Sequence, residues 1–437
     1  MKRHRWTVLA LLLGLFVAAG AAACGGDDEE SENATTGNAA ENVSGSVVLL
    51  ADWTGPEGES FKAVIEGFKK AYPNVNARYR PSTNLGQDLS TAVEGGNPPD
   101  LAAIPSPGIM ADYQKRGVLK PLTFAKSDIE QNYSTDWQDL GKINGTYYGV
   151  FFKGANKSTV WYSKKALSDA GVEPPTSFDD LITAMGTIKA SGLPPMAIGG
   201  SEGWTLTDLF ENIYARSAGP DMYRKLAAHE IKWTDPSVTK ALTEMGKILD
   251  GKNLLGGTAA TLQLSFDESC AKVLNVPAQA ALNFEGDFVP GVVAGKTNAK
   301  AGTDYDFFEF PKVGSSEDLV VSGGNVVIMF KDTPASQALV KYLASPEAGE
   351  IWAKRGGFTS PNKNVSADTY ASEIDKRARE PVASGGTVVF DLSDQAPGAF
   401  GSGDEFTIMQ GFLKNPSDVQ GTAKKLEDAA AKAYKTA

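Results

Sequence analysis

Strand and helix patterns alternate regularly near the start of this chain, and the alternation leaves few folds open to it. Residues 47–51 read Val-Val-Leu-Leu-Ala, a continuous apolar run of the kind found in strands that are buried on both faces. Large apolar residues then recur at helical spacing until Pro73 stops the helix. The segments, in chain order, are a strand at 47–51, a helix at 61–72, a strand at 74–79, a helix at 87–93 and a strand at 100–104. This order predicts a parallel sheet covered by helices, and therefore an α/β fold.

The length of the chain predicts more than one domain. A chain of 437 residues exceeds the size at which a single hydrophobic core stops growing, so we expect two domains. Helical patterns dominate the middle of the sequence, and strand-like segments return at 280–284, 305–310 and 326–330. An alanine- and lysine-rich stretch at 422–434 predicts a final helix.

The charge balance excludes nucleic acid as a partner. The formal net charge is −11, and removal of an N-terminal segment that holds Lys2, Arg3 and Arg5 would leave 39 basic against 53 acidic residues. Binding to phosphate needs lysine and arginine side chains that displace counterions, so an acidic chain of this kind repels nucleic acid and anionic lipid.

Histidine and cysteine are scarce, which narrows the chemistry. The two histidines are His4 and His229, and the two cysteines are Cys24 and Cys270. Once the N-terminus is removed, a catalytic triad or a multi-histidine metal site would have to rest on His229 alone. We interpret His229 as a surface residue and Cys270 as a small buried apolar residue without a disulfide partner. The sequence therefore predicts a protein that is not an enzyme, with no catalytic residue, metal or cofactor.

The N-terminus has the pattern of an export signal. A basic stretch at 2–5 precedes an apolar run at 6–17 and small residues at 18–23, and Cys24 follows directly. This order resembles a bacterial lipoprotein signal, in which the signal peptide 1–23 is removed and Cys24 becomes the lipidated first residue. A single transmembrane anchor is the alternative, because an apolar stretch of about 18 residues is barely long enough to span a bilayer.

The residues that follow favour the lipoprotein. Residues 24–45 are acidic, rich in small and polar side chains, and almost devoid of large apolar ones, so burial cannot fold them. We interpret them as a flexible tether behind the lipidated Cys24. The folded part would then be extracytoplasmic, attached to the cell membrane through lipid alone, at the cell surface or in the periplasm.

Five landmarks in a fixed order indicate a family. They are the Trp53 loop with the helix that ends at Pro73, the runs 96–101 and 117–122, the runs 148–150, 160–167 and 170–181, the run 280–288, and the runs 323–325 and 345–348. In this order the chain resembles the extracellular solute-binding proteins of ABC importers, and specifically their large carbohydrate-binding group. The C-terminal run 390–401 is similar to binders of α-glucosides and related oligosaccharides.

The resemblance implies a two-lobed periplasmic-binding-protein fold with a ligand cleft between discontinuous α/β lobes. The first lobe would take 45–154 and 318–364, the second 155–317 and 365–437, and crossovers would lie near 152–154, 319–323 and 358–361. The implied function is capture of a small-molecule carbohydrate by hinge closure, and delivery to the permease and ATPase subunits of an importer. A monomer is expected.

Aromatic residues in loops are the first candidates for the ligand site, because a sugar has apolar C–H faces and a rim of hydroxyls. Trp53 follows the first strand, at the carboxyl edge of the sheet where α/β proteins bind ligands, with lobe packing as its other interpretation. Trp204 follows the glycine-rich run 199–203 and enters a helix. The remaining tryptophans sit inside patterned strands or helices and are assigned mainly to packing: Trp137, Trp161, Trp233 and Trp352.

The other candidates come from strand ends and glycine-rich segments. Phe288 falls where the resembled family usually places a cleft aromatic, often tryptophan, and the phenylalanine departs from that pattern. Gly324 would let a ligand approach the backbone of a hinge strand. The polar and aromatic candidates beside them are Ser106, Glu285, Asp287, Asn325, Asp404 and Phe406.

Other readings of the sequence stay open. The same fold could bind a polyamine or another small solute, although the candidate loops are aromatic and acidic, which disfavours anions. An exported glycosidase would need only a pair of carboxylates, which so many acidic residues always allow. A surface protein that binds a partner, without ligand-induced closure, is the third alternative.

Overall fold

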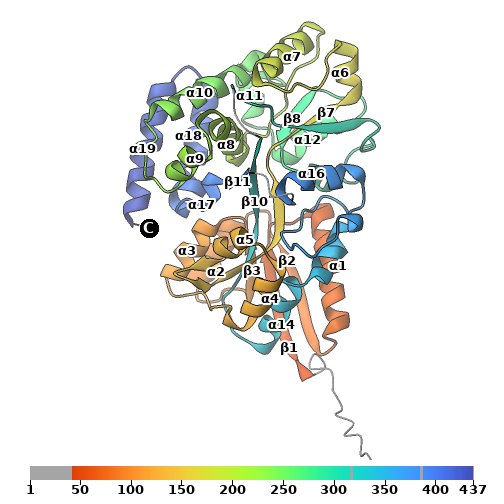
Figure 1. The fold of residues 1–437 in the computed structure, drawn as a ribbon, viewed down its shortest axis with the longest axis vertical. Helices are drawn as coiled ribbons and strands as arrows, with labels where there is room; N and C mark the ends of the chain where they lie inside the picture. Colours follow the sequence, from red (N-terminus) through yellow and green to blue (C-terminus); the bar gives the residue numbers. More distant parts are fainter. Residues whose placement is uncertain (1–41, 315–317, 384–386, 437) are drawn as a thin grey trace, which may run out of the picture. The chain divides into compact units, whose positions relative to one another are not determined.

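The computed structural model describes residues 42–314, 318–383 and 387–436. The predicted signal peptide, the lipidation site Cys24 and nearly all of the predicted tether lie outside the described residues. Figure 1 shows an α/β protein in which strands are enclosed by helices.

A mixed six-stranded sheet contains the alternation that the sequence predicts. Its strands are β1 (Gly45–Ala51), β2 (Val75–Pro81), β3 (Leu101–Ile104), β6 (Gly149–Asn156), β10 (Leu319–Met329) and β11 (Thr387–Phe390). The order is β11-β10-β3-β1-β2, with β6 also paired to β10. β1 pairs in parallel with both β2 and β3, as predicted, whereas β10 runs antiparallel to β3 and β6. A strand at 326–330 was predicted, but its antiparallel pairing with β3, from a distant part of the chain, was not.

Helices cover this sheet and hold its core. They are α1 (Gly55–Ala71), α2 (Leu85–Glu94), α3 (Pro107–Lys115), α4 (Lys126–Asn132), α5 (Thr135–Leu140), α14 (Pro334–Leu343) and α15 (Pro346–Ala353). The apolar face of α1 explains its position, because Phe61, Val64 and Phe68 recur at helical spacing and are fully buried. Trp352 of α15 packs edge-on against Trp53, with ring centroids 5.1 Å apart.

A second, three-stranded sheet is antiparallel and has the order β8-β7-β9. Its strands are β7 (Thr159–Ser163), β8 (Leu282–Glu285) and β9 (Tyr305–Glu309). The helices around it are α6 (Lys164–Ala170), α7 (Phe178–Ala190), α8 (Trp204–Ala218), α9 (Pro220–Ala227), α10 (Pro236–Ile248), α12 (Phe266–Leu274), α18 (Glu405–Lys414) and α19 (Val419–Thr436). Trp161 and Trp233 are fully buried in this region, which agrees with their assignment to packing.

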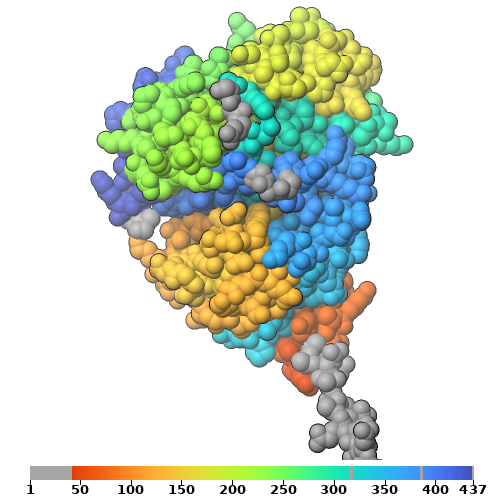
Figure 2. All heavy atoms as spheres, in the orientation of Figure 1, coloured from red at the N-terminus to blue at the C-terminus, as the bar shows by residue number. Residues whose placement is uncertain are grey.

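Shorter elements complete the described chain. They are the hairpin β4 (Lys142–Ile143) and β5 (Thr146–Tyr147), the helices α11 (Gly257–Thr261), α13 (Val289–Val293), α16 (Glu373–Ala383) and α17 (Leu392–Gln395), a π-helical turn at Phe400–Asp404, and 3₁₀ turns at Thr123–Ala125, Gly251–Asn253 and Ala367–Thr369. The chain passes from one sheet to the other where β6 ends at Asn156 and β7 begins at Thr159. In Figure 2 the blue C-terminal segment lies beside the orange segment that contains α3.

Cys270 and His229, which represent the two scarce residue types, pack in different surroundings. Cys270 is fully buried and its thiol contacts the Asn283 amide oxygen at 3.3 Å, as expected for a small core residue. His229 is only half-buried and lies in a left-handed turn, with its ring 3.3 Å from a Glu427 oxygen and stacked on Tyr434. The histidine is therefore a packed residue at the edge of the core rather than a free surface side chain.

Candidate functional site

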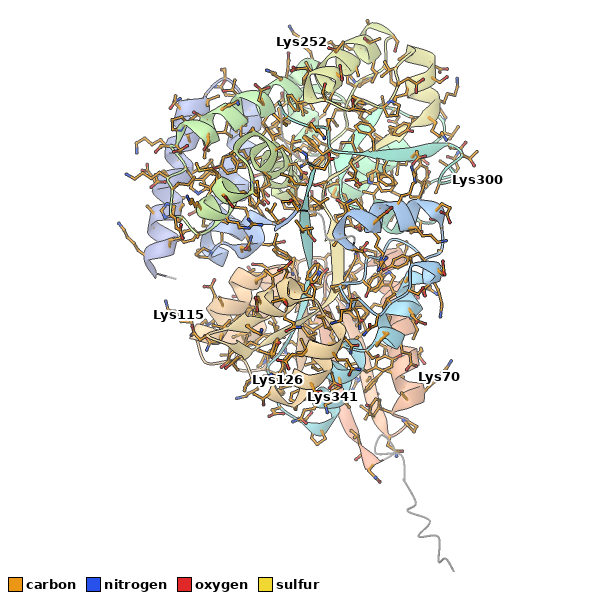
Figure 3. All side chains as sticks on the ribbon, in the orientation of Figure 1. Lys70, Lys115, Lys126, Lys252, Lys300 and Lys341 are labelled. Atoms are coloured by element: carbon orange, nitrogen blue, oxygen red, sulfur yellow. The ribbon has the colours of Figure 1, made fainter. Side chains whose placement is uncertain are left out.

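Two lysines lie at the passage between the sheets and organise the candidate site. Lys153, in β6, is 6% exposed and forms an ion pair with Glu57 at the start of α1. Its ammonium nitrogen lies 5.4 Å from the Phe288 ring centroid and 5.2 Å from that of Trp352. Figure 3 labels six lysines that extend outward from the surface, and Lys153 differs from all of them in being buried.

Lys157 follows β6 and lies among three buried carboxylates. It forms a short ion pair with Asp391, and its ammonium lies 3.3 Å from an Asp208 oxygen and 3.5 Å from an Asp394 oxygen. Burial opposes the charged form of Lys157, but the three carboxylates outweigh it and raise the pKa of Lys157 well above its ordinary value. The Lys157 ammonium also lies 5.9 Å from the Trp204 ring centroid. The lysine therefore stays charged and connects acidic and aromatic groups.

The pairing of β6 with β10 fixes the backbone beside Lys153. Asn325 of β10 lies opposite Lys153, and the register shifts between Asn325 and Val326, which marks a β-bulge. A Cβ atom at Gly324 would lie 2.5 Å from the Lys153 carbonyl oxygen. Only glycine tolerates so close an approach, so Gly324 here serves the contact between two strands.

Trp53 and Asn325, two predicted site residues that lie far apart in the sequence, form a hydrogen bond. The Trp53 indole nitrogen donates to the Asn325 side-chain oxygen at 3.3 Å, and the Asn325 amide donates to Asp52 at 3.3 Å. Trp53 is 2% exposed, and its ring lies 4.7 Å from that of Phe61. The ring of Trp53 is thus part of the core, while its indole N–H orients Asn325.

A second group of predicted residues forms an aromatic cluster. Trp204, at the start of α8, and Phe288 are both half-buried, and their ring centroids lie 6.4 Å apart. Phe266 packs against both, at 4.9 Å from Trp204 and 5.7 Å from Phe288. Phe406 borders the same cluster, because a Cβ at Gly203 would lie 2.7 Å from the Cβ of Phe406. Half-buried rings of this kind keep a face or edge available to a ligand.

The predicted acids behind this cluster are buried. Asp287 accepts a hydrogen bond from the Thr359 hydroxyl at 2.5 Å, and desolvation raises the pKa of Asp287 to about 7. Glu285 is 1% exposed, and its Oε1 has no hydrogen-bond partner among the described residues. Desolvation raises the pKa of Glu285 well above its ordinary value. Buried carboxyls of this kind can accept hydrogen bonds from a ligand hydroxyl.

Two of the predicted residues lie outside the aromatic cluster. Ser106 is fully buried and caps α3, accepting from the Ile109 backbone N–H at 3.0 Å and donating to the Asp394 carbonyl oxygen at 2.6 Å. Its hydroxyl thus joins α3 to the C-terminal segment. Asp404 is exposed at the end of the π-helical turn.

Sequence reasoning missed the acidic groups around Lys157. Asp208 and Glu211 of α8 and Asp391 are buried, and one carboxylate oxygen of each lies within 4.8 Å of the others. Desolvation raises the pKa values of Asp208 and Glu211, whereas the Lys157 charge overcomes burial and holds the pKa of Asp391 below its ordinary value. The signal available in the sequence was the pair Asp208 and Glu211, two acidic residues three positions apart on a predicted helix.

An open cavity of about 320 Å³ lies next to Trp53, at the carboxyl ends of β1 and β2. Its lining residues are Thr54, Gly55, Gly58, Glu59, Lys62, Pro81, Ser82, Thr83 and Asp88. Ser82 donates to Asp88 at 2.7 Å across its wall. Ligands of open α/β sheets bind at this edge, although none of these lining residues belongs to the groups around Lys153 and Lys157.

Comparison of the sequence with known protein families shows which family the chain belongs to. The sequence pattern of the bacterial extracellular solute-binding proteins matches residues 52–350, which is more than half of the chain. The chain belongs to this family. The predicted solute receptor, as opposed to an enzyme, is confirmed by this membership, and so is the predicted fold class.

The chain also aligns with individual relatives over most of its length. It is 32% identical over 403 residues to the alpha-glucosides-binding periplasmic protein AglE of Rhizobium meliloti, which covers 88% of this chain and 87% of that protein. It is 28% identical to the osmoprotective compounds-binding protein GgtB of Synechocystis, over 86% of this chain and 90% of that protein. The solved structure of the bacterial solute receptor AcbH matches with a TM-score of 0.80 at 21% identity, over 90% of this chain and 100% of that one.

No helix within the described part of the chain has the length and apolar character needed to cross a membrane.

Proposed function

We propose that this solute-binding protein captures an α-glucoside or a related oligosaccharide outside the cell and delivers it to the permease and ATPase subunits of an ABC importer. The observation that carries the proposal is the cluster of half-buried Trp204 and Phe288 beside Lys157 and buried carboxyls. The likeness to AglE, which is named for binding α-glucosides, supports the choice of sugar.

The chemistry of the cluster suits a sugar. Aromatic rings stack on the apolar C–H face of a pyranose, and the Trp204–Phe288 pair supplies two rings of different orientation, 50° apart. Lys157 donates to hydroxyl oxygens, while Asp208 and Glu285 accept from hydroxyl protons. These groups are buried already, so their hydrogen bonds to a ligand form in surroundings of low dielectric constant.

We further propose that capture uses hinge closure between a lobe of 45–154 and 318–364 and a lobe of 155–317 and 365–437. The passage of the chain from one sheet to the other at Lys157 supports this division, and β11 of the second lobe pairs with β10 of the first at the crossover near 319–323. Several contacts join the lobes, among them the Ser106 hydrogen bond to the Asp394 carbonyl, the Gly398 backbone N–H that donates to Asp112 at 3.0 Å, and the Thr359 hydroxyl that donates to Asp287. In an open form these side-chain contacts would break, the strand pairing at the crossovers would remain, and the aromatic cluster would gain exposure.

The sequence supports attachment to the membrane by lipid. A signal peptide over 1–23, a lipidated Cys24 and a tether over 24–45 would hold a monomeric receptor close to the importer. Metabolic labelling with a radioactive fatty acid tests this, because a Cys24→Ser chain should lose the label. Label retained in the Cys24→Ser chain would contradict lipidation at this cysteine.

A polyamine suits this site less well than a sugar does. Lys153 and Lys157 already neutralise part of the negative charge at the site, and a polycation would have to displace or approach these ammonium groups. The relatives do not favour it either, since the named ligands among the first relatives are glucosides and osmoprotective compounds.

Thermal unfolding of the purified receptor with a panel of α-glucosides, spermidine and glycerol phosphate tests the proposal. A ligand that binds only the folded state stabilises it by about 2.7 kcal/mol at a hundredfold excess over Kd. We expect a shift with at least one α-glucoside, and a smaller shift in the Trp204→Ala variant at the same concentration. A shift with spermidine alone would refute the choice of sugar and keep the receptor.

A further inference from the structure

The start of α3 lies against residues 391–398, which we call the bridging segment, more closely than a side chain would allow. A Cβ atom at Gly108, in the first turn of α3, would overlap the Ala396 carbonyl oxygen and lie 2.8 Å from the Ala396 carbonyl carbon. The backbone φ of Gly108 is not positive, so its conformation does not call for glycine. The close approach of the two backbones is therefore what requires glycine at this position.

Hydrogen bonds flank this contact on both sides. Ser106 is fully buried, and its hydroxyl donates to the Asp394 carbonyl oxygen at 2.6 Å. The Gly398 backbone N–H donates to an Asp112 carboxylate oxygen at 3.0 Å, and a Cβ at Gly398 would lie 2.9 Å from the Ile109 side chain. Figure 1 shows α17, which belongs to the bridging segment, next to α3. Three consecutive contacts thus hold the bridging segment on one helix.

The bridging segment is fixed to the groups around the candidate sugar site. Glu211 of α8 accepts hydrogen bonds from the backbone N–H groups of Leu392, at 2.7 Å, and Ser393, at 3.0 Å. Asp391 pairs with Lys157. All of these residues except Lys157 are buried to more than nine-tenths, so the segment moves as one body with α8.

We propose that the first turn of α3 and the bridging segment form a latch that stabilises the closed form of the receptor, with Gly108 and Asp112 as positioning residues for sugar capture. The inference rests on the proposed division into lobes, which assigns α3 to the first lobe and the bridging segment to the second. Gly108 sets how far the lobes close, because its missing side chain is where the two backbones approach most tightly.

The latch acts on affinity through the population of the closed form. It contains none of the groups that we assign to the sugar, so it stabilises the closed form before a sugar binds as well as afterwards. The apparent Kd of a ligand rises as the population of its binding-competent form falls. A change in the latch therefore alters sugar affinity while Trp204, Phe288 and Lys157 stay unchanged.

Small-angle X-ray scattering of the receptor without sugar tests the latch. Gly108→Val should increase the radius of gyration, because the valine side chain meets the Ala396 carbonyl and keeps the lobes apart. Ala111→Val, on an exposed position of the same helix, is the matched control and should leave the radius of gyration unchanged. Asp112→Ala removes a partly exposed side chain and should increase it less, which keeps the test decisive if Gly108→Val fails to fold.

Sugar binding is the second readout. The Kd of the best α-glucoside should rise roughly tenfold in Gly108→Val and stay unchanged in Ala111→Val. An equal radius of gyration in wild type, Gly108→Val and Asp112→Ala would overturn the latch, and a larger radius with an unchanged Kd would overturn the positioning role. The scattering comparison needs no ligand, so it decides the latch even if every α-glucoside fails to bind the wild type, a result that would refute the proposed sugar instead.

Discussion

Removal of the Lys157 charge should destabilise the receptor strongly. The Lys157→Met variant keeps the length of the side chain but leaves Asp208, Asp391 and Asp394 without their shared counterion. Lys157 is 12% exposed at its side chain and Asp391 is fully buried, so solvent cannot replace the lost charge. Loss of one partner from a buried ion pair costs about 3–5 kcal/mol, and we expect a decrease of that size in the free energy of unfolding at pH 7.

Urea denaturation measures this decrease, and a double variant separates its cause. Lys157→Met combined with Asp391→Asn removes both partners, and should recover a substantial part of the lost stability because one buried charge fewer is left uncompensated. Lys70→Met is the matched control on an exposed lysine, labelled in Figure 3, and should change stability by less than about 0.5 kcal/mol. A loss below about 1 kcal/mol in Lys157→Met would refute the reasoning, because surface pairs are worth that much.

Three further predictions follow from other contacts. Gly324→Ala should lower the unfolding free energy in urea denaturation, since its Cβ would lie 2.5 Å from the Lys153 carbonyl oxygen; an unchanged value would show that the strands separate freely. Trp204→Ala should weaken the best α-glucoside about tenfold by calorimetry, and a preserved Kd would remove Trp204 from the site. Burial raises the pKa of Asp287 to about 7, so the folded state takes up a proton before the unfolded state does, and stability should fall as pH rises from about 4 to 7. Asp287→Asn should flatten that slope, and an equal slope in both chains would contradict the assignment.

The sequence predicted the first half of the six-stranded sheet well, because each of its elements has a local pattern. The continuous apolar runs before Trp53 and at 100–104 are strands, and the helical repeat before Pro73 is α1. β10 is different: it pairs antiparallel with β3, more than two hundred residues away in the sequence, and parallel with β11, and no local pattern encodes those partners.

The candidate site was likewise predicted from the sequence only in part. Loop position suggested Trp204, the family resemblance suggested Phe288, and a hinge strand suggested Asn325. The structure brings the first two together and joins the third to Trp53. The central lysines were missed because nothing adjacent in sequence distinguishes Lys157 from an exposed lysine. Its ion-pair partner Asp391 is 234 residues away, and only the fold brings the two together.

A crystal structure of the receptor with the α-glucoside that stabilises it most would test the central claim most directly. The account predicts that one pyranose ring stacks on Trp204 or Phe288, with its hydroxyls within hydrogen-bond distance of Lys157 and of Asp208 or Glu285. A sugar bound elsewhere, with Trp204 and Lys157 unchanged and free of contact, would contradict it.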